Sequence, residues 1–281
     1  EAFGCAKTMN NDNSSRFGKF IEIQYDPQGF ICGAKITNYL LERTRIVTPL
    51  GAEERNYHVL YELFYHDDDF LQRSLFLDGA TPSDFACLAY SAAAPAQQAS
   101  DDAALIRVED VSLGRIQRSL ALLDVDGDTQ HQLFKILAAV LHLSNATFTE
   151  VHERGGGEGC EAVGHALASV QRAAALLNLE AEALLHALTV KTQFVHGEVY
   201  KKPLDAAMAA ARRDATAKYL YHSLFCWLVR AVNKCVSNEE RQRGFIGLLD
   251  IYGFESLAEN SLEQLLINYA NETLQRIFNA T

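Results

Sequence analysis

Residues 244–255 read GFIGLLDIYGFE, and this stretch decides the fold class. Its apolar run predicts a strand over residues 244–251 that is buried on both faces. Ligands of α/β sheets bind at the carboxyl ends of the strands, and Asp250 occupies that place. Asp250 is therefore a candidate for ordering Mg²⁺ and its waters, with a helix N-cap as the alternative. At Gly253 the missing side chain lets a backbone N–H approach a phosphate closely.

A second polar stretch, residues 11–20, reads NDNSSRFGKF and precedes a predicted strand. We interpret it as a loop in which the hydroxyls of Ser14 and Ser15 suit Mg²⁺ or phosphate oxygens, while main-chain amides bind anions. The guanidinium of Arg16 can pair with a carboxylate, and Glu255 is its candidate partner. Taken alone, the loop also fits a solvated turn that caps a helix, and Glu255 also fits a surface acid. Together the two loops predict a coupled pair of phosphate sensors.

The composition narrows the class of protein. With 281 residues, of which 48% are apolar, the chain is long enough for one large or two ordinary domains. A net charge of -11 argues against nucleic acid and anionic membranes as general partners. No apolar run approaches the ~18 residues that span a bilayer. Six cysteines without C-x-x-C spacing indicate a reduced, cytosolic compartment without a disulfide framework or a zinc site.

Periodicity predicts strands mixed with long helices, which indicates an α/β fold. Strands are expected at 18–25 and from 30 to 36, joined by a turn, and a hairpin is expected at 192–203. Helices are expected at 53–64, 131–143, 162–177, 181–188 and 205–236. A last helix opens at Ser261 with Gln264 as a capping box. Its predicted apolar stripe consists of Leu262, Leu265, Leu266 and Tyr269.

Two further segments are predicted to be surface loops. Residues 89–104 are rich in Ala, Ser and Gln, and residues 155–159 read GGGEG. The glycine-rich segment lacks the Lys-Ser/Thr that follows a phosphate-cradling loop, and no strand is expected before it. The glycine-rich segment is therefore not a strong candidate for a phosphate site.

These stretches resemble those of myosins. NDNSSRFGKF is similar to the myosin switch I, LLDIYGFE (248–255) to switch II, and INYANETLQRIFN (267–279) to the start of the relay helix. RNYHVLYELF, ILAAVLHLSN and ARRDATAKYLYHSLFCWLVRAVN are further family-like stretches, in the family's order. Arg16-Phe17-Gly18 and Gly253-Phe254-Glu255 are similar to myosins rather than to the related kinesins.

The resemblance implies a fold and a division of the chain. We expect an α/β core of the P-loop NTPase type, built as in a myosin motor, with a mostly helical upper actin-binding subdomain and strands of the central sheet. Residues 1–50 would hold switch I and a sheet hairpin, residues 51–243 the helical subdomain, and residues 244–281 the switch II strand and relay helix. No G-x-x-x-x-G-K-[ST] sequence occurs in the chain. We interpret the chain as a fragment whose phosphate-cradling loop would lie before Glu1.

The resemblance also implies roles for single residues. Ser15 would ligate Mg²⁺, and Asp250 would hold it through water. Ser14 would contact the γ-phosphate and the attacking water, and the Gly253 N–H would bond the γ-phosphate. The remaining implied roles are those of Asn11 and Asn13 at the nucleotide, of Arg16 and Glu255 as the ion pair that closes the site, and of Asn271 and Glu272 near the bend of the relay helix.

An actin site is implied as well. Residues 191–203, KTQFVHGEVYKKP, resemble the upper actin-contacting loop, with Glu198, Lys201 and Lys202 as the candidate contacts. An acid at position 198 suggests that no phosphorylation is needed for activation. The alternative is a solvated hairpin face without a partner.

The function implied is part of an actin-activated, Mg-ATP-hydrolysing motor of the cytoplasmic actin cytoskeleton. Its partners would be the actin filament and ATP, with calmodulin-like light chains outside this stretch. The alternative is a myosin-like actin-binding scaffold without ATP turnover. The chain alone is expected to bind ATP weakly and to be inactive.

Overall fold

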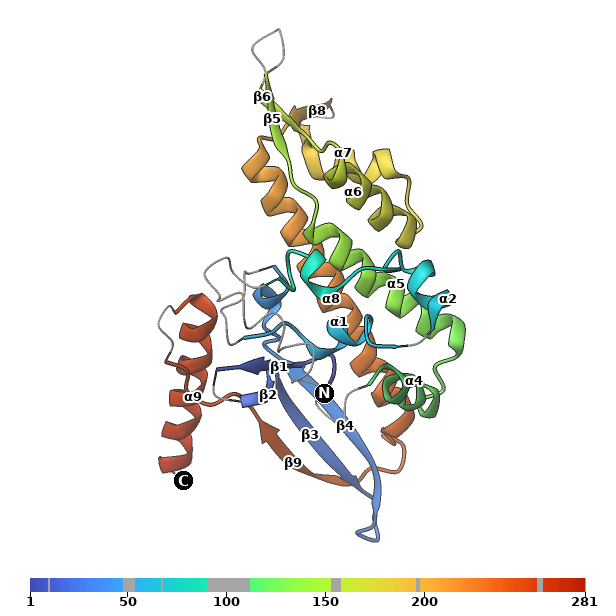
Figure 1. Ribbon diagram of the computed structural model, residues 1–281. Coiled ribbons are helices and arrows are strands. Elements are labelled where there is room, and N and C mark those ends of the chain that lie inside the picture. The colour runs from blue at the N-terminus through green and yellow to red at the C-terminus, as the bar shows by residue number, and fades with distance from the viewer. Residues whose placement is uncertain are drawn as a thin grey trace.

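The computed structural model describes residues 1–9, 11–47, 54–66, 68–89, 112–152, 158–195, 198–256 and 260–280. Figure 1 shows a layer of packed helices above a twisted three-stranded sheet, with the last helix, α9 (Leu262–Ala280), beside the sheet. The long helix α8 (Ala206–Val236) connects the helical layer with the sheet. The predicted mixture of strands and long helices is confirmed.

The three-stranded sheet has the order β4-β3-β9, and both pairings are antiparallel. It consists of β3 (Gly18–Tyr25), β4 (Ile31–Tyr39) and β9 (Gly244–Asp250). The predicted hairpin between β3 and β4 is confirmed, and its turn is built on Asp26, whose carboxylate accepts from the backbone N–H groups of Gln28 and Phe30. Gly29 adopts a φ of 84°, which favours glycine.

The environment predicted for β9 is wrong. The strand exists, but every one of its residues is exposed, including Phe245, Ile246, Leu248 and Leu249. Among the described residues, β9 pairs only with β3 and forms an edge of the sheet. An unbroken apolar run indicates that a strand is suited to burial, but it does not indicate which segment covers the strand.

The segment predicted as a polar loop begins with a strand instead. β2 (Asn11–Ser15) pairs with β1 (Cys5–Thr8), and the register sets Ser14 opposite Ala6 and Ser15 opposite Cys5. Cys5 and Ala6 are buried, whereas β2 is polar along its length. The backbone ladder to a buried neighbour therefore holds a strand that composition alone assigns to a loop.

The helical body comprises α1 (His58–Glu62), α2 (Asp69–Ser74), α4 (Leu113–Leu122), α5 (Gly127–Ser144), α6 (His165–Leu176), α7 (Ala181–Thr189) and α8. Two short 3₁₀ turns, η1 (Arg43–Ile46) and η2 (Pro82–Asp84), accompany it. The helices predicted at 131–143, 162–177, 181–188 and 205–236 are confirmed, with small shifts at their ends. The helix expected at 53–64 is shorter, because only α1 is helical there.

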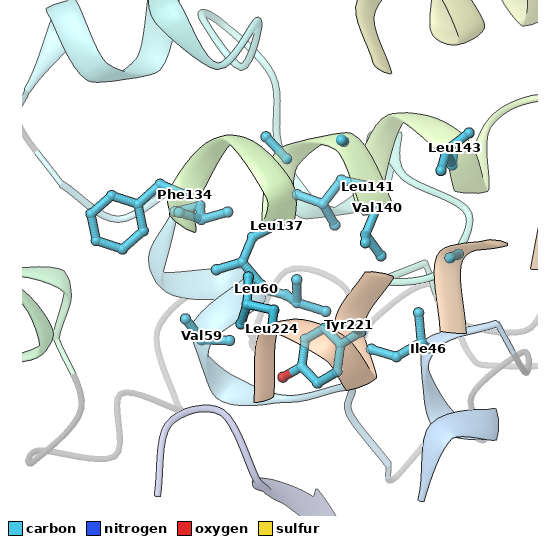
Figure 2. Packing of buried hydrophobic residues seen from close by; sticks show 14 of the residues in the cluster. Ile46, Val59, Leu60, Phe134, Leu137, Val140, Leu141, Leu143, Tyr221 and Leu224 are labelled. Carbon is cyan, nitrogen blue, oxygen red and sulfur yellow. The ribbon is translucent and has the colours of Figure 1, made fainter. Parts of the chain in front are cut away.

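The core of the helical body lies between α5, α8 and α1. Figure 2 shows Leu137 and Leu141 of α5 directed toward Leu60 of α1 and Tyr221 of α8. All four side chains are buried. Tyr221 also stacks on Tyr57, with ring centroids 4.9 Å apart, and its hydroxyl donates to the carbonyl of Phe3. The predicted burial of α5 is confirmed.

The C-terminal end of α8 is tied to the sheet. The Asn233 side chain accepts from the N–H of Ile36 and donates to its carbonyl, each at 2.7 Å, along the open edge of β4. At Gly33 the backbones approach so closely that a Cβ would lie 2.8 Å from the Val236 carbonyl oxygen. Buried Gln24 adds a hydrogen bond to the backbone of Asn238. β4 is thereby held against one end of the long helix.

Two hairpins project from the helical body: β5 (Thr149–His152) with β6 (Glu158–Glu161), and β7 (Val190–Val195) with β8 (Glu198–Pro203). The second confirms the hairpin predicted at 192–203. Glu158 and Gly159, predicted in a surface loop, lie in β6, and the prediction that no strand precedes this loop is wrong, because β5 ends at His152. Residues 155–157 and most of the predicted loop at 89–104 lie outside the described residues.

Helix α9 begins as predicted, since the Ser261 N–H donates to Oε1 of Gln264 at 2.9 Å. Its predicted apolar stripe is exposed, however, and the buried side chains are Gln264 and Ile267. α9 packs through another face, which carries Gln264, Ile267 and Asn268, so its apolar stripe is directed away from the described residues. None of the described helices has the length and apolarity required to span a bilayer.

Candidate functional site

The two segments singled out in the sequence meet in space. Nη1 of Arg16 lies 2.8 Å from Oε1 of Glu255, and the two side chains are 5% and 15% exposed. This is the contact that the sequence predicted. We call β1, β2, residues 250–256 and the first turns of α9 the switch region.

A cavity of about 230 Å³ lies at this contact. Its lining consists of Thr8, Met9, Asn11, Ser14, Ser15, Arg16, Glu54, Tyr252, Gly253, Phe254, Glu255 and Ser256. The predicted residues Asn11, Ser14, Ser15, Arg16, Gly253 and Glu255 are thus brought to one place. A Cβ at Gly253 would meet no atom within 4 Å, so this backbone is open to a ligand.

Arg16 has a second carboxylate partner that the sequence did not reveal. Its Nε donates to Oε2 of Glu42 at 2.7 Å, and its Nη1 also donates to the Ser14 hydroxyl at 3.3 Å. Burial opposes the charged form, but the carboxylate of Glu42 and the hydrogen bonds to Glu255 and Glu42 raise the pKa of Arg16 above its ordinary value. The guanidinium is a fixed cation beside the cavity.

Tyr252 attaches residues 250–256 to the sheet. Its hydroxyl donates toward the carbonyl oxygens of Arg16, at 3.0 Å, and of Leu40. The guanidinium of Arg16 lies 5.7 Å from the centroid of its ring, within cation–π range. Burial raises the pKa of Tyr252, so the phenol stays protonated and remains a donor.

Helix α9 holds Glu255 directly. The Asn268 side chain accepts from the Glu255 N–H at 2.7 Å and donates to the Glu255 carbonyl at 2.6 Å. Nε2 of Gln264 donates to Oε2 of Glu255 at 3.3 Å. Gln264 and Asn268, one turn apart on α9, therefore hold Glu255 in place. No sequence motif or spacing predicts this contact.

The predicted relay residues lie one turn further along α9. Nδ2 of Asn271 donates to the carbonyl of Ile267 at 3.0 Å, and Glu272 is exposed. α9 is helical without interruption through both residues. The contacts with residues 250–256 are therefore made by Gln264 and Asn268, and the role of Asn271 and Glu272 stays a prediction.

Two predicted site residues face elsewhere. Asp250 ends β9, where its carboxylate pairs with Nζ of Lys19 at 3.0 Å, and it does not line the cavity. Oδ1 of Asn13 accepts from Nε2 of His58 at 3.0 Å. Burial, with Arg55 adding to it, lowers the pKa of His58 to about 4, so this donor is neutral near pH 7.

The groups around the cavity suit oxygen-rich anions and a hard cation. Hydroxyls, a guanidinium and a free backbone N–H fit phosphate oxygens, and the Ser15 hydroxyl, 3.8 Å from the Cys5 sulfur, fits Mg²⁺. The described residues contain no cluster of His, Cys, Asp and Glu that would enclose a metal by itself. Because Mg²⁺ is usually shared between one or two protein ligands and substrate phosphates, the residues present fit that ion.

The candidate actin contacts lie on the hairpin β7–β8, far along the chain from the cavity. Every residue of β8 is exposed, including Glu198, Lys201 and Lys202. The Tyr200 hydroxyl donates to Oε2 of Glu198 at 2.6 Å, whereas neither lysine pairs with a carboxylate of another described residue. The geometry presents mixed charges to solvent at the tip of the helical body.

Comparison with known proteins gives consistent matches. The sequence profile of the family described as myosin head (motor domain) matches residues 1–281. The chain is 40% identical over 282 residues to unconventional myosin IC of Drosophila melanogaster, which covers 99% of the chain and 26% of that protein. It is 39% identical over 279 residues to the myosin-I heavy chain of Dictyostelium discoideum, covering 99% of the chain and 11% of that protein.

A human relative is similar to the same degree. Unconventional myosin-XIX of Homo sapiens is 38% identical over 283 residues, which covers 99% of the chain and 27% of that protein. The chain therefore spans about a quarter or less of the length of the relatives it matches.

Proposed function

The chain belongs to the myosin head (motor domain) family, and from this premise we propose that it forms part of an actin-activated motor that hydrolyses Mg-ATP. The observation that supports this most directly is the ion pair between Arg16 and Glu255 at the wall of a cavity lined by serine hydroxyls. The pairing joins the two segments that resemble switch I and switch II.

The cavity would take only part of a nucleotide, and we propose that this part is its phosphate end. Its volume of about 230 Å³ is smaller than the roughly 300–1,000 Å³ typical of sites that enclose drug-sized ligands. The Gly253 N–H and the Ser14 hydroxyl would bind the terminal phosphate, and Asn11 would contact the phosphates from β2. Asn13, held by His58, would position that strand.

Phosphoryl transfer depends mainly on positioning and charge stabilisation. Arg16 and Glu255 close the wall of the cavity, so the attacking water would be confined next to the Ser14 hydroxyl, which Arg16 orients. When bound, Mg²⁺ would neutralise phosphate charge, with the Ser15 hydroxyl and, through water, Asp250 as its protein ligands. For this role the Asp250 carboxylate would have to turn from its ion pair with Lys19 toward the cavity.

The clamp on Glu255 couples the site to α9. A shift of residues 252–256 would move α9 with it, because Gln264 and Asn268 hold Glu255 at its side chain and its backbone. Asn271 and Glu272 would lie where the relay helix bends. Ordering and shifting of switch segments by a γ-phosphate is a recognised form of bistability.

The remaining assignments follow the same premise. Residues 1–50 would act as switch I with its hairpin, residues 51–243 as the upper actin-binding part, and residues 244–281 as switch II with the relay helix. Glu198, Lys201 and Lys202 would contact the actin filament. We place the protein in the cytoplasm on the actin cytoskeleton, and light chains would bind outside this stretch.

The proposal is tested in a protein that joins this chain to a phosphate-cradling loop. Glu255→Ala should lower steady-state ATP turnover by at least about 100-fold while ATP still binds, because the wall no longer closes. Glu239→Ala, at an exposed ion pair with Lys35, is the matched control and should leave turnover unchanged. Unimpaired turnover in Glu255→Ala would favour a scaffold without catalysis.

The isolated chain offers a second test. It contains no G-x-x-x-x-G-K-[ST] sequence and its cavity at the Arg16–Glu255 pair has a volume of only about 230 Å³, so ATP should bind weakly. Isothermal titration should detect no binding in the micromolar range. Micromolar affinity would show that these residues hold ATP without the cradling loop.

A further inference from the structure

Arg16 contacts its two carboxylates through different nitrogens. Glu42 accepts from Nε at 2.7 Å, and Glu255 pairs with Nη1 at 2.8 Å. The two acids therefore do not compete for one N–H group. Either contact can break while the other persists, since the planar guanidinium carries its donors at separate positions.

The two acids differ in how they are anchored. The Glu42 N–H donates to the Arg16 carbonyl at 3.0 Å, and the Tyr57 hydroxyl donates to the Glu42 carbonyl at 2.8 Å. Glu42 thus belongs to the same rigid part as Arg16. Glu255 lies in a segment without regular secondary structure and is held by α9. A movement of α9 would carry away Glu255 and leave Glu42 in place.

The charges remain balanced without Glu255. Arg45 pairs with Glu42 at 2.8 Å and with Glu54 at 3.4 Å. Arg16, Glu42, Arg45 and Glu54 form a continuous chain of two cations and two anions, which is neutral by itself. The side chains of Arg16, Glu42 and Arg45 are only 5%, 11% and 4% exposed, so an unpaired charge among them would be costly.

We propose that Glu42 is the permanent counter-ion of Arg16 and thereby makes Glu255 a releasable latch. With Glu42 in place, departure of Glu255 leaves Arg16 paired and the buried cluster neutral. Without the charge of Glu42, opening would leave a buried guanidinium unpaired, so the latch would stay closed longer. Glu42 is a positioning residue that sets how readily the wall of the cavity opens.

The test uses amide hydrogen exchange of the full chain, read over residues 252–256. Glu42→Gln should slow exchange there by at least about threefold, whereas Glu255→Gln should accelerate it. A merely structural role for Glu42 would accelerate exchange throughout, including the amides of α5. Glu239→Gln, at the exposed pair with Lys35, is the matched control and should change neither segment.

A conservative variant keeps the proposal testable if Glu42→Gln fails to fold. Glu42→Asp keeps the charge but moves it away from Arg16, so it should slow exchange over 252–256 by a smaller factor than Glu42→Gln. Unchanged or faster exchange over 252–256 in either folded variant would overturn the proposal.

A second arm rests on the proposed function and addresses turnover. In a hydrolysing protein that contains this chain, Glu42→Gln should keep the single-turnover cleavage of ATP and slow release of phosphate at least about threefold. Slower exchange without any ATP cleavage in the unsubstituted protein would support the latch and contradict the proposed function. Unslowed phosphate release in a cleaving protein would show that the latch does not control the exit.

Discussion

The helical body and the switch region are held together by different kinds of contact. In the helical body, apolar side chains of α5, α8 and α1 meet and exclude water. In the switch region, residues 252–256 are held by an ion pair, by the Tyr252 hydroxyl and by the amide groups of α9, while the apolar residues of β9 and the apolar stripe of α9 remain exposed. Apolar packing is nondirectional and dense, whereas a few polar contacts can break and re-form together. The comparison indicates that stability resides in the first region and movement in the second.

The largest expected effect lies in the helical body. Leu137→Ala removes a fully buried side chain of α5 and should lower the free energy of unfolding by about 2–5 kcal/mol, because a cavity remains in a packed core. Urea denaturation followed by circular dichroism measures it. A loss below about 1 kcal/mol would contradict the picture of a tightly packed body.

A pH effect of intermediate size comes from two buried histidines of the helical body, of which His58 also contacts Asn13 in the switch region. Burial lowers the pKa of His142 in α5 to about 4, and His58 beneath β2 has a pKa of about 4 for the same main reason. The unfolded chain binds these protons near pH 6.5, so the stability contribution is present above that pH and is lost as the pH falls toward 4.

The measurement compares unfolding at pH 7 and pH 4.5. His142→Gln should reduce the difference in the free energy of unfolding by about 2 kcal/mol, because its proton no longer favours the unfolded chain. His58→Gln should act similarly and, in addition, alter exchange at Asn13. Equal pH dependence in the variant and the unsubstituted chain would contradict the assignment.

A smaller effect distinguishes two asparagine clamps. Asn268 holds Glu255 by two backbone hydrogen bonds, and Asn145 in the helical body holds the backbone of Asp84 and Ala86 in the same manner. Each Ala variant loses about 1–3 kcal/mol of local interaction.

Asn268→Ala should accelerate hydrogen exchange over 253–256 and leave the unfolding midpoint nearly unchanged, whereas Asn145→Ala should lower the midpoint. The clamp of the switch region lies outside the stable core, so local opening is expected to register before global unfolding. A lowered unfolding midpoint in both variants would show that the two regions unfold as one cooperative unit.

The smallest effect concerns the exposed stripe of α9. Leu265→Ala should change the free energy of unfolding by less than about 0.5 kcal/mol in this chain, because its side chain is already in solvent. Thermal denaturation beside Leu137→Ala gives the direct contrast. A loss comparable to that of Leu137→Ala would show that the stripe is buried.

Much of the fold was predictable because α5 and α8 carry long, periodic apolar patterns with polar caps. The exposure of β9 and of the stripe on α9 was not predictable, because an apolar sequence shows that a surface is suited to burial but not whether another segment covers it. The pair Arg16–Glu255 could be predicted from complementary groups in two phosphate-type segments.

Glu42 and Asn268 could not be found in the same way. Glu42 pairs with the charge of Arg16, and Asn268 bonds to the backbone of Glu255, and in each case the two residues are well separated in the sequence. Neither residue belongs to a sequence motif whose spacing would identify it. The strand β2 was not predicted because its residues are all polar, and its strand conformation depends on pairing with β1.

Helix α8 has a mechanical consequence. At one end Arg212 donates to the carbonyls of Ala187 and Val190, at the base of the hairpin β7–β8. At the other end Asn233 grips β4. Asn233 follows Arg212 by 21 residues of this continuous helix, a distance of roughly 32 Å at 1.5 Å per residue. Since a hydrogen-bonded helix is stiffer than a loop, we expect a displacement of the hairpin base to be passed along α8 to β4, the strand beside β3. The molecule therefore contains a strut that connects the exposed hairpin β7–β8 with the sheet formed by β4, β3 and β9.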